Sequence, residues 1–243
     1  MSTPVFLTNL TWPQAEALLA EDDRLLLVTG ATEQHGHHLP LGTDNAIPLL
    51  LAERLSAATG VPIAPTLPIG NSESFMAFPG TLTLSEETTR TLFLELVQSC
   101  YRPGWRRLFV LNGHGGNRSA WEWVAALATK IKPDLKLYLT HWWREPFVQE
   151  LVRERMGRTE GHAGLEETAM MLVAQPELVQ RGDAVADDVE ALPDTVWTQP
   201  DALRHAVPSG AFGIDPSQAT AALGEAILQR LLDDYLPLLD GEW

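Results

Sequence analysis

Short apolar runs alternate with longer stretches of helical periodicity along the first part of the chain. Residues 24–30 (RLLLVTG) are apolar almost throughout and close with glycine, a pattern that predicts a buried strand. Similar runs predict strands at residues 61–67, 107–111 and 135–140. Apolar residues at helical spacing predict the intervening helices at residues 45–58, 85–101 and 119–131.

The C-terminal part of the chain contains a long irregular segment followed by one helix. Residues 184–207 have little periodicity and several prolines, which is typical of a loop that covers a site or an interface. The pattern at residues 215–218 (DPSQ) predicts the start of a helix that ends at Pro237. The strand–helix alternation predicts an α/β fold with a mostly parallel sheet and helices on both faces. We expect residues 1–243 to form a single domain, a length sufficient for one large core.

Composition and charge narrow the classes of partner. The formal net charge of −15 repels phosphate backbones, so we expect no nucleic-acid partner. The single cysteine, Cys100, excludes both an intramolecular disulfide and a cluster of thiolate ligands. The sequence has neither a signal-peptide pattern nor an apolar stretch of the ~20 residues that a membrane helix needs. We therefore expect a cytoplasmic protein with no membrane partner.

Polar clusters follow two of the predicted strands and open one further helical run. They are the segments 30–44 (GATEQHGHHLPLGTD), 112–117 (NGHGGN) and 161–168 (GHAGLEET). Five of the seven histidines lie in these segments, which is more than a random scatter would place there. Because ligands of open α/β sheets bind beyond the carboxyl ends of the strands, we expect these clusters to contribute to one site.

The residue types in these clusters indicate a metal site. Carboxylate and imidazole groups are ligands for zinc, manganese or iron(II), and the chain has no thiolate cluster to compete with them. Glu33 and His35 alternate in sequence, so they point to the same side of an extended backbone. Asp44 returns after a loop rich in glycine and proline, close enough to bridge two ions about 3.5–4 Å apart. His114 lies between glycines, which allow the backbone a close approach to a ligand.

Other interpretations of these residues stay open. Glu33 and Asp44 are also compatible with a helix cap or a surface pair, and residues 113–117 with a simple turn between strand and helix. That segment lacks the spacing and the lysine of a phosphate-binding loop. His38 is also compatible with a structural role, and His37 with either the pocket or the outside. The remaining histidines have no acidic partner nearby in sequence and are not expected to be ligands: His141 and His205.

The three clusters, in this order, resemble the motifs of the creatininase (creatinine amidohydrolase) family. Residues 78–81 (FPGT) and 210–213 (GAFG) also match family landmarks, so the resemblance spans roughly residues 7–236. It implies a three-layer α/β/α fold with a site for two divalent metal ions at the carboxyl edge of the sheet. It also implies a homo-oligomer, because family members are commonly hexamers built as trimers of dimers.

The resemblance also implies roles for individual residues. Glu33, Asp44 and His114 would hold one ion, while His35 and Asp44 would hold the other. Creatininase has an acidic ligand at the position of Gly116, and Glu167 is the residue that we expect to replace it here. His162 matches the catalytic histidine that handles the proton.

Substrate contacts are expected from residues 71–76 and 184–207 and from two tryptophans. Ser74 stands where many relatives carry histidine, and Trp142 and Trp143 are expected to flank the substrate, with a role in the core as the alternative. Glu166 is expected to be an outer-shell or helix-surface residue. The vacancy at Gly116 argues against creatinine itself as the substrate.

Together these features predict a dinuclear metal-dependent amidohydrolase. A metal-bridging hydroxide would cleave the C–N bond of a formamide, a cyclic amide or a small peptide, with a histidine as proton carrier. Three alternatives stay open: creatinine amidohydrolase proper, a sugar isomerase or phosphoesterase with the same ions, and a non-catalytic binding protein.

Overall fold

A three-stranded parallel sheet lies at the centre of the described part of the chain. The computed structural model describes residues 2–156, 161–189 and 192–241. Strands β1 (Arg24–Thr29), β2 (Arg107–Asn112) and β3 (Lys136–His141) follow one another in that order. They pair without stagger, so that Thr29, Asn112 and His141 end side by side. The predicted parallel sheet is therefore confirmed, and its carboxyl ends meet at one edge.

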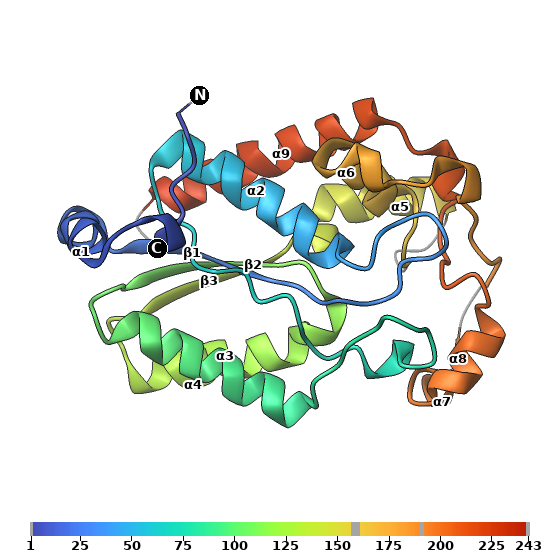
Figure 1. Cartoon of the computed structure of the whole chain (residues 1–243), viewed down its shortest axis with the longest axis horizontal. Coiled ribbons are helices and arrows are strands. Elements are labelled where there is room, and N and C mark those ends of the chain that lie inside the picture. The colour runs from blue at the N-terminus through green and yellow to red at the C-terminus, as the bar shows by residue number, and fades with distance from the viewer. Residues whose placement is uncertain (1, 157–160, 190–191, 242–243) are drawn as a thin grey trace.

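Helices cover both faces of this sheet (Figure 1). One face carries α2 (Thr43–Thr59), α5 (Pro146–Met156), α6 (Leu165–Ala174) and α9 (Ala221–Asp240). The other carries α3 (Glu86–Tyr101) and α4 (Arg118–Ile131). This arrangement is the three-layer α/β/α fold that the sequence predicted.

Alternating residues of the strands supply two separate cores. Leu26 and Val28 of β1 pack toward α2 and α9, whereas Leu25 and Leu27 pack toward α3 and α4. Neighbouring residues of a strand point to opposite faces, so an uninterrupted apolar run is what a strand covered on both sides requires.

The segment predicted as a strand at residues 61–67 runs beside β1 but is not a regular strand. Isolated bridges join Ile63 to Leu26 and Leu67 to Thr29. The prolines at positions 62, 65 and 68 have no N–H group to donate, which prevents a continuous ladder. The segment therefore extends the sheet only in part.

The helix predicted at residues 215–236 begins at Ala221 and ends at Asp240 in the structure. Asp215 caps only the 3₁₀ helix Pro216–Gln218, and Thr220 caps α9, which continues through Pro237 to Asp240. Pro237 lies in the last turn, where a missing N–H group removes a single hydrogen bond.

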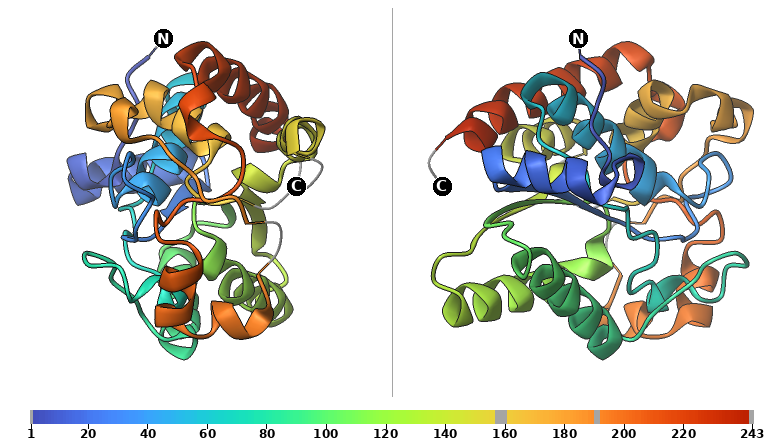
Figure 2. Two further views of the ribbon diagram at one scale, coloured as in Figure 1. Left: turned by 90° about the vertical axis from the view of Figure 1, so that its right-hand side faces the viewer. Right: turned by 60° about the vertical axis from the view of Figure 1, so that its left-hand side comes forward.

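Some helices of the structure were not predicted from the sequence. The apolar pattern did not indicate α1 (Trp12–Glu21) or α5, and the segment 184–207 was predicted as an irregular loop. Within 184–207, α7 (Asp194–Trp197) and α8 (Pro200–Ala206) form, and α8 packs on the 3₁₀ helix Glu73–Phe75 (Figure 2). Further 3₁₀ helices span Leu7–Asn9, Gly115–Asn117, Trp142–Arg144, Pro176–Leu178 and Arg181–Asp183. Among the described residues, none of the helices has the length and apolar character needed to cross a membrane.

Leu51 on α2 provides a test of the core, because it is fully buried between the sheet and α9. Leu51→Ala should lower the free energy of unfolding by about 2–5 kcal/mol through the cavity that it leaves. Chemical denaturation measures this change. The matched control is Leu178→Ala at an exposed position, which should shift the value by about 0.5 kcal/mol or less. Equal effects of the two substitutions would contradict the packing described here.

Candidate metal centre

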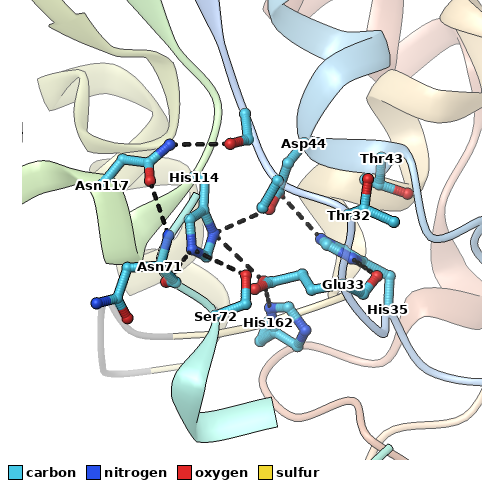
Figure 3. Close-up of polar contacts among 12 residues, drawn as sticks. Thr32, Glu33, His35, Thr43, Asp44, Asn71, Ser72, His114, Asn117 and His162 are labelled. Carbon is cyan, nitrogen blue, oxygen red and sulfur yellow. Dashed lines mark hydrogen bonds and ion pairs between the residues drawn. The ribbon is translucent and has the colours of Figure 1, made fainter. Parts of the chain in front are cut away.

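The candidate metal centre lies just beyond the carboxyl ends of β1 and β2. The loop after β1 carries Glu33 and His35, the first turn of α2 carries Asp44, and the turn after β2 carries His114 (Figure 3). Asn117 joins the loops, since its Nδ2 donates to Gly30 O at 2.9 Å and its Oδ1 accepts from Asn71 N at 3.2 Å. The topology thus brings the polar clusters to one edge of the sheet.

The expected ligands form two groups of three that share Asp44. One group is Glu33, Asp44 and His114; the other is His35, Asp44 and Glu167; within each, the candidate ligand atoms lie within 4.8 Å of one another. His114 Nδ1 lies 2.9 Å from Asp44 Oδ2 and 3.4 Å from Glu33 Oε1. His35 Nε2 lies 3.1 Å from Asp44 Oδ1 and 3.9 Å from Glu167 Oε1. All five predicted metal ligands therefore face a common centre.

Backbone carbonyls fix which nitrogen of each histidine faces this centre. Nδ1 of His35 lies 3.1 Å from Glu33 O, and Nε2 of His114 lies 2.6 Å from Asn71 O. A carbonyl oxygen only accepts hydrogen bonds, so each of these nitrogens carries the proton and donates it. In the neutral form of each ring, the opposite nitrogen carries the lone pair and faces the carboxylates. This is the arrangement in which a histidine coordinates a metal ion.

Two buried carboxylate oxygens lack a donor while the facing imidazoles are neutral. Among the described residues, Glu33 Oε2 accepts no hydrogen bond, and Asp44 Oδ2 has only His114 Nδ1 nearby, at 2.9 Å. Lone pairs that face one another in a buried cluster repel unless a positive charge lies between them. The donor set therefore fits divalent cations.

The electrostatics of the metal-free cluster agree with this interpretation. Burial opposes the imidazolium form, yet Asp44, Glu167 and Glu33 raise the pKa of His35 to about 10. The pKa of His114 is likewise raised well above 6.5 against the effect of burial. Burial, with the charge of Asp44, raises the pKa of Glu167 to about 8. The cluster takes up protons where cations would otherwise compensate its charge.

His162 lies beside the expected ligands but differs from His35 and His114 in the direction of its pKa shift. Its Nε2 donates to Gln34 O at 2.8 Å, and its Nδ1 lies 4.0 Å from Glu33 Oε1. The ring stacks on Phe75 with centroids 4.5 Å apart. Burial, aided by the charge of His35, lowers the pKa of His162 to about 4. The neutral ring thus offers Nδ1 as a proton acceptor on the side of the metal ligands.

A cavity of about 270 Å³ opens above these groups. Ser74 and Trp143 line it, as expected from the sequence, and the Ser74 hydroxyl donates to Trp197 O at 2.7 Å. Trp142 does not line it. Its side chain is only 2% exposed and packs in the core with α2 and α9, whereas Trp143, the next residue of the 3₁₀ helix Trp142–Arg144, is only partly buried and reaches the cavity. The expected substrate contact of Trp142 is therefore wrong, and the alternative of a core aromatic is correct.

Several residues that line the cavity were not predicted from the sequence. Phe75, Trp197 and Phe212 come from three separate segments and form apolar walls. Two of them lie in the segments singled out for substrate contacts, and Phe212 lies in the GAFG landmark, but nothing in the pattern marked these side chains. Glu166 lines the cavity and is 8% exposed, so the expectation of a helix-surface residue is wrong, and the alternative of an outer-shell residue stays a prediction.

The remaining histidines lie outside the two groups of ligands. His37 is exposed, whereas His38 is buried and pairs with Thr168 Oγ1 at 2.9 Å. His141 contacts Asn112 Nδ2 at 3.0 Å, and His205 is exposed. None of the four belongs to a cluster that could hold a metal ion among the described residues.

Gly116 has no room for a side chain. A Cβ atom there would collide with the backbone oxygen of Asn71 and with Nε2 of His114. Because that oxygen anchors His114, an acidic residue at position 116 would disturb the ligand that it accompanies. The nearby carboxylate of Glu167 comes from another segment, the start of α6, and its Oε1 lies 3.9 Å from His35 Nε2.

Buried carboxylates, oriented imidazoles and a neutral histidine at the edge of a parallel sheet are features of metal-dependent hydrolases. The family model of creatininase, described as creatinine amidohydrolase, matches residues 8–239, and the chain belongs to this family. It is accordingly a metal-dependent hydrolase that acts on carbon–nitrogen bonds.

Relatives and solved structures agree with this assignment. The creatinine amidohydrolase of Pseudomonas putida is 30% identical over 91% of this chain and 86% of its own length. The mycofactocin precursor peptide peptidase of Mycobacterium ulcerans is also 30% identical, over 92% and 83%. A creatininase structure with manganese superposes with a TM-score of 0.83 at 28% identity, covering 96% of this chain and 99% of that one. A Zn-Zn form of a creatininase mutant gives 0.82 at 27% identity, over 97% and 100%.

The raised pKa values predict how the stability of the metal-free protein depends on pH. A group with a higher pKa in the folded than in the unfolded state stabilises the fold at low pH, and this contribution is lost as the pH rises through the folded value. For His35 and Glu167 the folded values are about 10 and about 8, against 6.5 and 4.5 for the free groups. The free energy of unfolding of the chelator-treated protein should therefore fall between pH 6.5 and pH 10.

Denaturant titrations at a series of pH values measure this dependence. The metal-loaded protein is the control and should lose less stability over the same range, because cations replace the protons. A metal-free protein whose stability stays level or rises from pH 6.5 to pH 10 would contradict the charge balance described here.

Proposed function

We propose that the chain is a dinuclear amidohydrolase with Asp44 as the bridging ligand. Glu33, Asp44 and His114 would hold one divalent ion, and His35, Asp44 and Glu167 the other. The observation that carries the proposal is the pair of ligand groups that share one carboxylate, with both histidines already oriented by backbone carbonyls. Zinc and manganese, the metals of the related creatininase structures, suit these ligands, as does iron(II).

The chain's own residues provide the proton transfer. When bound, two divalent ions would acidify a water molecule and polarise the substrate carbonyl. His162 Nδ1 faces the ligands, so it accepts a proton there and passes it to the leaving nitrogen. The hydrogen bond from Nε2 to Gln34 O holds the ring in this orientation and stabilises its charged form.

The cavity favours a small amide or the end of a longer chain. Its volume of about 270 Å³ admits a compact acyl or amine group, and aromatic side chains form part of its wall. The related proteins are named for a cyclic amide and for a precursor peptide, both of which are cleaved at a C–N bond. Gly116 leaves no room for the acidic ligand that creatininase carries at this position, so the two centres would differ in one ligand. We therefore infer a small amide other than creatinine as the substrate.

Family membership favours C–N hydrolysis over the sugar isomerase, phosphoesterase and non-catalytic alternatives. We infer one catalytic domain, because the candidate ligands come from segments spread between residues 33 and 167. Assembly as a homohexamer and a cytoplasmic location stay predictions of the sequence.

Metal content tests the ligand assignment. The loaded protein should contain two ions per chain; Asp44→Ala should lose both, while His114→Ala and Glu167→Gln should each retain at most one. Elemental analysis after dialysis measures the content. Glu225→Gln is the control, since it removes an exposed carboxyl on α9 and should keep both ions. Two tightly bound ions in Glu167→Gln would refute its place as a ligand.

The role of His162 is tested separately from metal binding. His162→Ala should keep both ions and lower kcat by about 10²–10⁴-fold, because the leaving nitrogen then lacks its proton carrier. A panel of formamides, lactams and short peptides provides the assay. Undiminished turnover in a variant with normal metal content would exclude the proton transfer assigned to this residue.

A further inference from the structure

Glu166 and Glu167 are adjacent in the first turn of α6 but face different surroundings. Neighbouring residues of a helix point about 100° apart. Glu167 turns toward His35 and the candidate ligands, whereas Glu166 turns toward the cavity wall. The two carboxyl groups therefore have separate roles.

The carboxyl of Glu166 lines the cavity and has no partner from another described residue. The residue is 8% exposed, and among the described residues no side chain and no main-chain group other than its own N–H donates to it. A carboxyl group in the wall of a cavity can accept hydrogen bonds from a donor that enters the cavity.

Aromatic side chains line the same cavities as this carboxyl group. Trp143, Trp197 and Phe212 line the inner cavity with Glu166, and the same residues continue into an adjoining outer cavity of about 480 Å³. The rings of Trp197 and Phe212 lie with centroids 5.6 Å apart. Aromatic faces beside a carboxylate attract cations through the ring quadrupole and through charge-assisted hydrogen bonds.

The cationic side chains of this region lie farther out. Arg118 and Arg144 line only the outer cavity, where Asp194 accompanies them, and both are exposed. Arg118 also pairs with Glu122 at 3.4 Å. In the described residues, the inner cavity has no lysine or arginine in its wall, so Glu166 meets a bound group there without competition from an internal cation.

We propose that Glu166 is a specificity-determining residue that binds a cationic nitrogen group, an ammonium or a guanidinium, on the amide substrate. Trp143, Trp197 and Phe212 flank that group while the amide carbonyl lies at the metal ligands. The inference rests on the proposed function, because it places the scissile amide beside Asp44 and His162.

A matched pair of probes tests the preference for charge without requiring turnover. Butylguanidinium and butylurea have nearly the same shape, and only the first is a cation. Titration calorimetry with the metal-loaded protein should show at least tenfold tighter binding of butylguanidinium. In Glu166→Gln the two affinities should agree within about twofold, and in the control Glu225→Gln the tenfold preference should remain.

Metal content of each variant separates this proposal from the preceding one. A variant with both ions and no charge preference supports the role of Glu166, whereas loss of ions in the Asp44 and Glu167 variants concerns the metal centre alone. If Glu166→Gln fails to fold, Glu166→Asp keeps the charge but withdraws it by one methylene and should give an intermediate preference. Equal binding of both probes by the unaltered protein, or an unchanged preference in Glu166→Gln, would overturn the proposal.

Discussion

The concentration of carboxylate charge at a buried edge of the sheet is the constraint on which the rest of the structure depends. Glu33 and Asp44 are buried beside each other, and Glu167, whose side chain is 15% exposed, approaches Asp44 from the other side of His35. Such a cluster is tolerated only when positive charge lies within it. The lone pairs of His35 and His114 point into the same space, because backbone carbonyls occupy their other nitrogens. Cations are the compensation that this geometry prepares for, and protons take their place in the metal-free protein.

The fold reduces the cost of this charge before any ion binds. Asp44 lies in the first turn of α2 and Glu167 in the first turn of α6, where the positive end of a helix dipole favours a carboxylate. Close packing makes this possible, since a Cβ at Gly113 would collide with the backbone oxygen of Asp44. The glycine after β2 thus allows the start of α2 to reach the strand ends. The starts of α2 and α6 and the glycine after β2 thus all help to accommodate the negative charge of the candidate ligands.

The parts of the structure governed by local pattern could be predicted from the sequence. The apolar runs of β1, β2 and β3 and the capped start of α3 followed from periodicity and from Ser85. Residues 61–67 were predicted as a strand because their apolar content outweighed their prolines in the pattern.

Trp142 and Trp143 show a different limit: they are neighbours in a 3₁₀ helix and point in different directions, and the sequence alone does not say which of them reaches the cavity. Glu166 and Glu167 present the same ambiguity within one helical turn. Phe75, Trp197 and Phe212 meet only because distant segments pack together, which no local pattern records.

The residues that could be predicted from local motifs and those that could not have different proposed functions: the first are candidate metal ligands, and the second form the walls of the cavity. The candidate ligands come from compact motifs whose spacing is dictated by coordination geometry, so a motif suffices to recognise them. The walls of the cavity come from the segment after residue 70, from α7 and from the GAFG landmark, and the first of these also holds His114 through Asn71 O. Relatives at 30% identity are named for a cyclic amide and for a peptide, so the shared framework serves amides of different shape. Glu166 lies at the boundary between the two parts. It shares a helical turn with a candidate metal ligand but faces the wall, so a substitution at position 166 changes the group that the cavity accepts while the backbone that holds Glu167 stays in place.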